Sequence, residues 1–285
     1  LFGIAAQLKD IPHAFNKLVE DSSERKLIIE KGQEQLRKRR EGRDHTQSHF
    51  NKATNVNQFG DDYYLMLLNS VWDTAALGIH TVYESMLDWI LDSIDWVLNN
   101  TDKTILIRQH PAERGKQINN TDTYKEKIES KFGINKRIIF IEARQDVNSY
   151  DLIENALCVL GFSSTIIVES AMLGKPAIII SNAYFSNFGI AYNASDKKEY
   201  YMYLLKSSKK ELKITEEMKN RACISNYLTQ TCNLYRTEFT PVRTNFLKWS
   251  ELSIEDLERD YLPIQAILRN KPLSILQHER ISNDA

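Results

Sequence analysis

The sequence predicts an α/β protein built around a doubly wound parallel sheet, with helical segments before and after it. Between residues 63 and 181, short apolar runs alternate with stretches of helical periodicity. The apolar runs lack an alternating polar face, which is typical of strands covered on both sides. Residues 155–181 also contain one complete strand–turn–helix–turn–strand unit. Alternation of this kind is the pattern of parallel strands joined by helical crossovers.

The unit at residues 155–181 shows the pattern most clearly. Leu157 to Phe162 is an apolar run typical of a strand, a helix is expected from Ile166 to Leu173, and a second strand from Ala177 to Ile180. Gly174 should end the helix, and the Lys-Pro pair after it cannot continue a helix. Between the first strand and the helix stand the hydroxyl residues Ser163, Ser164 and Thr165. They can cap the helix or join its N–H groups in binding a phosphate, and this turn alone favours neither.

The other elements are predicted in the same way from periodicity and from Gly, Pro and capping residues. Helices are expected over residues 1–21, with an interruption at Pro12, and over 24–41, ahead of a polar linker over 42–62. In the sheet domain, strands are expected over 63–71, 104–108 and 137–141 and helices over 82–98, 122–132 and 150–156. After a loop over 182–193, helices follow over 197–207, over 215–235 and from 254 onward. The predicted organisation is a helical and linker segment over 1–62, a sheet domain over 63–195 and a helical extension over 196–285.

Composition excludes several classes of protein. With 285 residues, 42% hydrophobic and 26% charged, the chain has the make-up of a soluble globular protein. A net charge of -1 argues against general nucleic-acid binding. No apolar run reaches the roughly 20 residues of a membrane span. Three cysteines (Cys158, Cys223 and Cys232) form no CxxC pair, which suits a reducing cytoplasm. Because the chain begins at Leu1, we expect it to be part of a longer protein.

Candidate site residues gather at one predicted edge of the sheet. Loops that follow parallel strands leave at the strands' carboxyl ends, where ligands bind. This rule brings together residues that lie far apart in sequence: Trp72, Asp73, Arg108, His110, Glu113, Ser163, Ser164 and Thr165. His110 could stabilise phosphate charge as a leaving group departs. Glu169, one helical turn beyond Thr165, could bind ribose hydroxyls.

Several motifs are missing from the sequence. There is no GxGxxG after the first expected strand and no GxxxxGK[ST], which argues against dinucleotide-dependent hydride transfer and against a P-loop NTPase. The sequence contains no Asp-x-Asp pair, the motif that would hold a divalent ion against a phosphate. Chemistry without a metal is therefore expected. The basic cluster at residues 37–40 is interpreted as a solvated helix end, where cations are favourable.

Three motifs resemble the capsule polysaccharide biosynthesis glycosyltransferases, in the same order and at similar spacing. They are Arg-Gln-His-Pro-Ala-Glu at 108–113, Ser-Tyr-Asp-Leu at 149–152, and the segment 161–176 with Ser-Ser-Thr, Glu169 and Gly-Lys-Pro. The resemblance covers about residues 63–192. These enzymes have the GT-B fold of two Rossmann-like domains and include Kdo transferases, so the resemblance implies that this chain holds mainly the C-terminal donor domain. Residues 1–62 would then be a remnant of, or a bridge to, a missing N-terminal acceptor domain.

The resemblance also implies a function and its residues. It implies transfer of a sugar from a CMP-activated donor, such as CMP-Kdo, to a growing capsule or lipopolysaccharide glycan. His110 would contact the donor phosphate together with Ser163 and Ser164, and Glu169 would bind ribose. No cofactor is implied, because the nucleotide sugar is a substrate. The implied partners are a glycan or glycolipid acceptor and other assembly enzymes, and the implied location is the cytoplasm, with peripheral association at the inner membrane.

Other functions stay open at this point. A polyol-phosphate transferase acting on a CDP-alcohol would use similar His-Pro and Ser-Ser/Thr motifs. A UDP-sugar 2-epimerase would favour glycines where Ser163 and Ser164 stand. A degenerate donor domain that acts only as an assembly module would bind no nucleotide.

Overall fold

The computed structural model describes residues 2–20, 22–43, 56–70, 82–114, 124–231, 253–260 and 268–269. The chain forms two compact units, one of residues Leu1–Lys17 with Tyr227–Ala285 and one of residues Leu18–Asn226. The second unit contains the sheet. Residues 18–62 and 196–226 group with the sheet in this division, and the expected segments 1–62, 63–195 and 196–285 stay a prediction.

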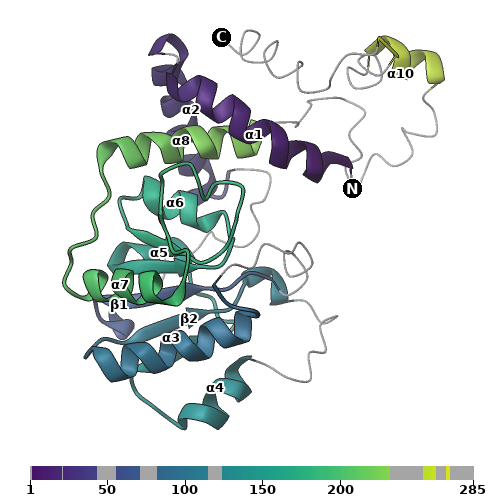
Figure 1. The fold of residues 1–285 in the computed structure, drawn as a ribbon. Helices are drawn as coiled ribbons and strands as arrows, with labels where there is room; N and C mark the ends of the chain where they lie inside the picture. The colour runs from purple at the N-terminus through teal and green to yellow at the C-terminus, as the bar shows by residue number, and fades with distance from the viewer. Residues whose placement is uncertain are drawn as a thin grey trace. The chain divides into compact units, whose positions relative to one another are not determined.

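A parallel sheet of six strands forms the centre of the second unit and confirms the predicted fold class (Figure 1). The strand order is β3-β2-β1-β4-β5-β6, and every neighbouring pair is parallel. The strands are β1 (Tyr63–Leu67), β2 (Ile105–Arg108), β3 (Ile138–Ile141), β4 (Ala156–Gly161), β5 (Ala177–Ile179) and β6 (Tyr192–Asn193). The last of these lies in the stretch expected to be a loop, since two residues carry no periodic signal.

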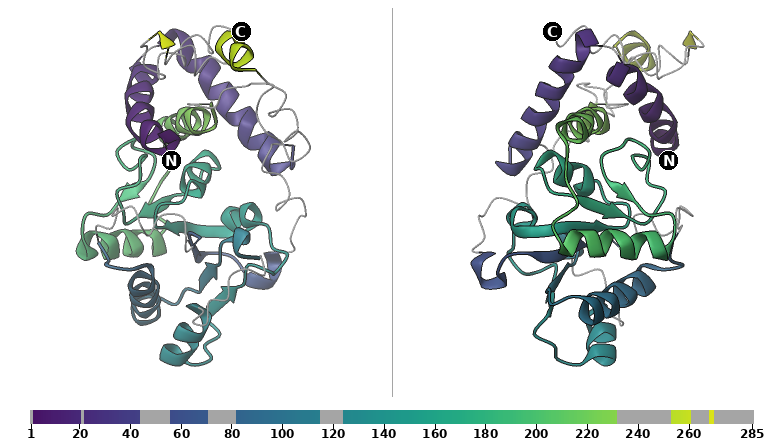
Figure 2. Two further views of the ribbon diagram at one scale, coloured as in Figure 1. Left: turned by 90° about the vertical axis from the view of Figure 1, so that its right-hand side faces the viewer. Right: turned by 60° about the vertical axis from the view of Figure 1, so that its left-hand side comes forward.

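Helices cover both faces of the sheet. The bounds are α1 (Phe2–Glu20), α2 (Ser22–Arg40), η2 (Val56–Phe59), α3 (Met86–Asn100), η4 (Pro111–Arg114), α4 (Tyr124–Phe132), α5 (Ser149–Asn155), α6 (Ile166–Met172), α7 (Lys197–Ser208), α8 (Glu216–Thr231) and α10 (Ile254–Asp260). Two further views show α3 and α6 on opposite sides of the sheet (Figure 2). Helix α1 runs through Pro12 without the expected interruption.

Strand residues alternate between two buried layers, which explains their continuous apolar runs. Tyr64 and Met66 pack with α3 and α7 in one hydrophobic cluster, while the Tyr63 hydroxyl on the other face donates to the Leu152 carbonyl of α5 at 2.7 Å. A polar pair lies inside the first layer, where the Trp89 ring nitrogen donates to the Tyr200 hydroxyl at 3.0 Å.

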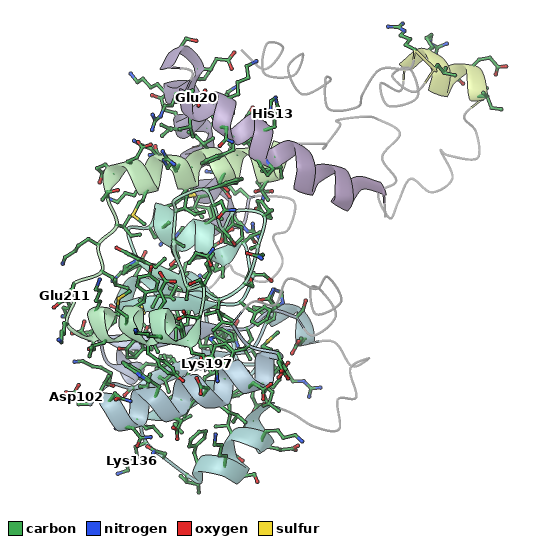
Figure 3. All side chains as sticks on the ribbon, viewed as in Figure 1. His13, Glu20, Asp102, Lys136, Lys197 and Glu211 are labelled. Carbon is green, nitrogen blue, oxygen red and sulfur yellow. The ribbon has the colours of Figure 1, made fainter. Side chains whose placement is uncertain are left out.

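Helix α2 is held against α8 by a close backbone approach. A Cβ at Gly32 would lie 2.2 Å from the Cys223 carbonyl oxygen, so only glycine allows this crossing. The Asn226 amide donates to the Gly32 carbonyl at 3.2 Å, and Arg25 forms an ion pair with Glu217. These contacts fix α2 within the sheet's unit. By contrast, loop residues at the amino ends of β2 and β3, such as Asp102 and Lys136, extend outward (Figure 3).

Candidate active site

The site lies at the switch point of the sheet, between β1 and β4. Strand order reverses there, so the loops that follow these two strands separate and leave a crevice at their carboxyl ends. Asn69, just after β1, spans the crevice: its amide nitrogen donates to the Ser163 hydroxyl at 3.0 Å, and its oxygen accepts from the Ser163 backbone N–H at 3.3 Å. Sequence reasoning missed Asn69, because it placed residue 69 inside a strand that in fact ends at Leu67.

One cavity at this crevice brings together residues from five parts of the chain. It is lined by Arg39, Leu67, Leu68, Arg108, Gln109, His110, Pro111, Ser149, Tyr150, Ser164, Thr165, Ile166 and Glu169. The predicted candidates Arg108, His110, Ser164, Thr165 and Glu169 are therefore neighbours in the fold. The roles assigned to these residues stay predictions.

The cavity is small in this conformation. Its volume is about 70 Å³, well below the roughly 300–1,000 Å³ of pockets that enclose a drug-sized ligand. Only part of a nucleotide sugar, such as a phosphate group, could enter it without movement of side chains. The rest of such a ligand would have to lie in the crevice outside.

The hydroxyl turn before α6 is not used for helix capping at Thr165. Thr165 occupies the N-cap position with helical dihedral angles (φ −61°, ψ −19°), and its side chain makes no capping hydrogen bond. The Ser163 hydroxyl is bonded to Asn69 instead. Of the two alternatives left open for these hydroxyls, capping is therefore not observed at Thr165, and contact with a ligand stays a prediction for Ser164 and Thr165.

Glu169 is the one carboxylate among the described residues that line the cavity. Its side chain is 3% exposed, and both oxygens are bonded: Oε2 accepts from the Tyr150 hydroxyl at 2.8 Å, and Oε1 lies 2.9 Å from an Arg39 guanidinium nitrogen. A buried carboxylate needs such partners, because desolvation of an unpaired charge is costly. Glu169 is thus a fixed and satisfied acceptor at the cavity wall.

The basic cluster of α2 differs from its interpretation as a solvated helix end. Arg37 and Lys38 are solvated, with 54% and 49% of their side chains exposed. Arg39 is only 21% exposed and lines the cavity. Its neighbour Arg40 pairs with Glu154 of α5 at 2.5 Å. Sequence reasoning missed Arg39 because its position depends on the distant packing of α2.

The segment after β2 places His110 at the cavity and Glu113 beside it. His110 is half-buried, and the buried Pro111 begins η4 directly after it. Gln109 donates to the Glu113 carboxylate at 2.6 Å and accepts from the Ala143 backbone N–H at 3.0 Å. Among the described residues, Glu113 is not part of the cavity lining, although its backbone N–H donates to the His110 carbonyl at 3.0 Å; its role in substrate binding stays a prediction. Trp72 and Asp73 lie outside the described residues.

Arg108, expected as a substrate-binding residue, holds a loop in the structure. Its side chain is 1% exposed, and its guanidinium donates to the carbonyls of Glu142, of Gln145 at 3.3 Å and of Val147 at 3.2 Å. These carbonyls belong to the loop between β3 and α5, which delivers Ser149 and Tyr150 to the cavity. Arg108 is in this respect a positioning residue, and a direct contact with a ligand stays a prediction.

The described part of the chain holds no group of three or more His, Cys, Asp or Glu side chains with metal-binding geometry. Within the same residues, no helix has the length and apolar character needed to cross a bilayer.

Comparisons with known proteins found a family and a curated protein that are similar to this chain. The sequence model of a family described as capsule polysaccharide biosynthesis protein matches residues 19–224, nearly the whole unit that carries the sheet. The capsule polysaccharide export protein KpsS of Escherichia coli is 22% identical over 142 residues, which cover 48% of this chain and 34% of that protein. The chain therefore spans about a third of this curated relative.

Solved structures of similar fold include two kinds of protein. A β Kdo 2,4 transferase, KpsC of Thermosulfurimonas dismutans, aligns with a TM-score of 0.45 and 16% identity over 72% of this chain and 56% of that one. The UDP-GlcNAc 2-epimerase of Methanocaldococcus jannaschii aligns with a TM-score of 0.40 and 21% identity over 63% of this chain and 50% of that one.

Proposed function

This chain belongs to the capsule polysaccharide biosynthesis protein family, and on that premise we propose that it binds a nucleotide-sugar donor and takes part in transfer of the sugar to a growing capsule glycan. The observation that carries the proposal is the cavity at the switch point of the sheet. It gathers an imidazole, two hydroxyls and a buried carboxylate, from His110, Ser164, Thr165 and Glu169, where α/β proteins bind their ligands.

The proposed roles follow from the chemistry of these groups. His110 donates a ring N–H to the donor phosphate and stabilises the negative charge that develops as the bond from the sugar to the phosphate oxygen breaks. Ser164 and Thr165 donate hydroxyl hydrogen bonds to the same phosphate. Ser163, bonded to Asn69, orients the turn. Glu169 accepts from the ribose hydroxyls.

The acceptor side of the reaction lies outside the residues assigned here. In transfer, an acceptor hydroxyl oxygen forms the new bond to the sugar and gives its proton to a base, for which this chain offers no assigned residue. A CMP-activated sugar such as CMP-Kdo is the proposed donor, on the resemblance of the motifs at 108–113 and 161–176. The proposed location is the cytoplasmic face of the inner membrane, where a glycolipid acceptor would be reached.

Calorimetric titration with CMP, CDP and UDP tests donor binding directly. His110→Ala and Ser164→Ala should each weaken binding of the preferred nucleotide about ten- to a hundredfold, because a charge-assisted phosphate contact contributes on the order of 1.5–3 kcal/mol. Matched controls are His13→Ala, an exposed residue of α1 (Figure 3), and Ser208→Ala, a half-buried residue at the end of α7. Neither control should change the affinity.

Two results would overturn the proposal. One is no binding of any of these nucleotides, which is what an assembly module predicts. The other is a change of less than about twofold in both site variants. Incubation with CMP-Kdo, CMP-sialic acid or CDP-glycerol and an acceptor glycan, followed by product analysis, separates sugar transfer from polyol-phosphate transfer.

A further inference from the structure

We propose that Arg39, on helix α2 outside the sheet, is a phosphate-binding residue of the same cavity; the identity of the phosphate as that of a nucleotide donor rests on the proposed function. The sequence patterns at 108–113 and 161–176 do not include Arg39, and its neighbours on α2 are solvated. Its side chain is nevertheless directed to the cavity that contains His110, Ser164 and Thr165.

The burial of Arg39 sets it apart within its own cluster. Its side chain is 21% exposed, against 54% for Arg37, 49% for Lys38 and 36% for Arg40. A guanidinium loses hydration at a cost when it enters a protein interior, so it needs an anion there. Glu169 supplies that anion at 2.9 Å.

The charges of Arg39 and Glu169 indicate how this ion pair would affect the binding of an anionic ligand. A phosphate placed beside the Glu169 carboxylate would meet a like charge in a site with little water, which is unfavourable. Arg39 lies against that carboxylate and offsets its charge. The guanidinium is a planar fork of five N–H donors, so it can bind a carboxylate along one edge and a phosphate along another.

The fold holds Arg39 at this place from several directions. Gly32 allows the close crossing of α2 with α8, and Asn226 bonds to the Gly32 carbonyl. At the end of α2, Arg40 pairs with Glu154, and its guanidinium lies 5.7 Å from the centre of the Tyr150 ring. Tyr150 in turn donates to Glu169. Arg39 is thus directed to the cavity by the same residues that hold its carboxylate partner.

The test compares ligands that differ only in the phosphate. Affinities for CMP and for cytidine are measured by calorimetry on the whole chain with Arg39→Gln, Arg39→Lys and the matched control Arg37→Gln. Arg39→Gln should weaken CMP binding ten- to a hundredfold and change cytidine binding less than twofold. Arg39→Lys should recover part of the loss, since lysine keeps the charge without the fork. Arg37→Gln should change neither affinity.

A second background guards against a purely structural effect. Removal of Arg39 leaves Glu169 buried without its cation, which would disturb the fold. The measurements are therefore repeated with Glu169→Gln added both to the wild-type chain and to the Arg39→Gln variant. The loss of CMP affinity on Arg39→Gln should persist in this background. Equal weakening of CMP and cytidine, or no loss in either background, would overturn the proposal.

Inorganic pyrophosphate separates this inference from the proposed function. Pyrophosphate binding that depends on Arg39, together with no binding of any nucleotide, would support the anion site and contradict donor binding. If nucleotide affinity does not change on Arg39→Gln, only the proposal that Arg39 binds phosphate is contradicted. Absence of binding for both probes would contradict both.

Discussion

Replacement of Arg108 by methionine should show how much one guanidinium contributes to the loop that supports the cavity. Arg108 is the last residue of β2 and is 1% exposed. Its guanidinium donates to the carbonyls of Glu142, Gln145 and Val147. Methionine keeps an unbranched apolar chain of similar length, so the change removes the charge and the donors while it limits the cavity left behind.

The size of the effect follows from these contacts. Hydrogen bonds to a charged group contribute roughly 1.5–3 kcal/mol each, so three of them set an upper limit of about 9 kcal/mol. Gln145 is exposed and the other two loop residues are half-buried, so water can replace part of what is lost. We therefore expect the free energy of unfolding to fall by about 2–6 kcal/mol, because each of the two carbonyls in half-buried residues loses its donor at a cost of about 1–3 kcal/mol. Equilibrium urea denaturation with an unchanged m-value measures it.

Arg137 offers a matched control at the opposite end of the sheet. It precedes β3, and its guanidinium donates to the carbonyls of Val97, Leu98, Thr101 and Lys103. Arg137→Met should reduce stability to a similar degree without affecting nucleotide binding. Arg108→Met should also weaken CMP binding, because the loop positions Ser149 and Tyr150. A loss below about 1 kcal/mol for Arg108→Met, or equal effects of both variants on binding, would refute the reasoning.

Other changes in the same unit have effects of predictable sign. Tyr150→Phe removes the 2.8 Å hydrogen bond to buried Glu169 and should lower the free energy of unfolding by roughly 1.5–3 kcal/mol in urea; an unchanged midpoint would contradict this. Gly32→Ala places a Cβ 2.2 Å from the Cys223 carbonyl oxygen and should cost about 3 kcal/mol in thermal or urea unfolding, whereas a neutral result would mean that α2 and α8 separate freely. Burial raises the pKa of the Cys158 thiol from 9.0 to about 12, so its contribution to stability should be complete below pH 9 and should decline by up to about 4 kcal/mol toward pH 12. Urea titrations on either side of pH 9 measure that decline, and rapid reaction of Cys158 with a thiol reagent in the native protein would count against its burial.

Local sequence was sufficient for elements whose limits are set by neighbouring residues. The strand expected over 157–162 is observed over 156–161, and the helix expected from Ile166 begins there. Gly174 ends that helix with a φ of +77°, a conformation that glycine adopts without strain. Such limits depend on the apolar run and on the next few residues, so the sequence displays them directly.

The gathering of His110, Ser164, Thr165 and Glu169 was also predictable, since it follows from a rule that holds for parallel sheets in general. The same rule places the loop that carries Glu113 but does not orient the side chains of that loop. Glu113 accepts from Gln109 instead of lining the cavity. The only sequence signal for Asn69 was its position as a polar residue soon after an apolar run. The strand expected over 63–71 included this position, so Asn69 was not considered as a site residue.

By itself, the sequence determined that this protein has a parallel α/β fold of a capsule-related type, and it predicted which loops meet at one edge of the sheet. Tertiary structure alone decided which groups surround that edge. Arg39 of α2 pairs with Glu169, Asn69 donates a hydrogen bond to Ser163, and Arg108 donates to a carbonyl of the loop between β3 and α5. The physical reason is the range of the interactions. Periodicity and turns act over a few residues, whereas the ion pair of Arg39 with Glu169 depends on a backbone crossing at Gly32 and on contacts with α5 and α6 far along the chain.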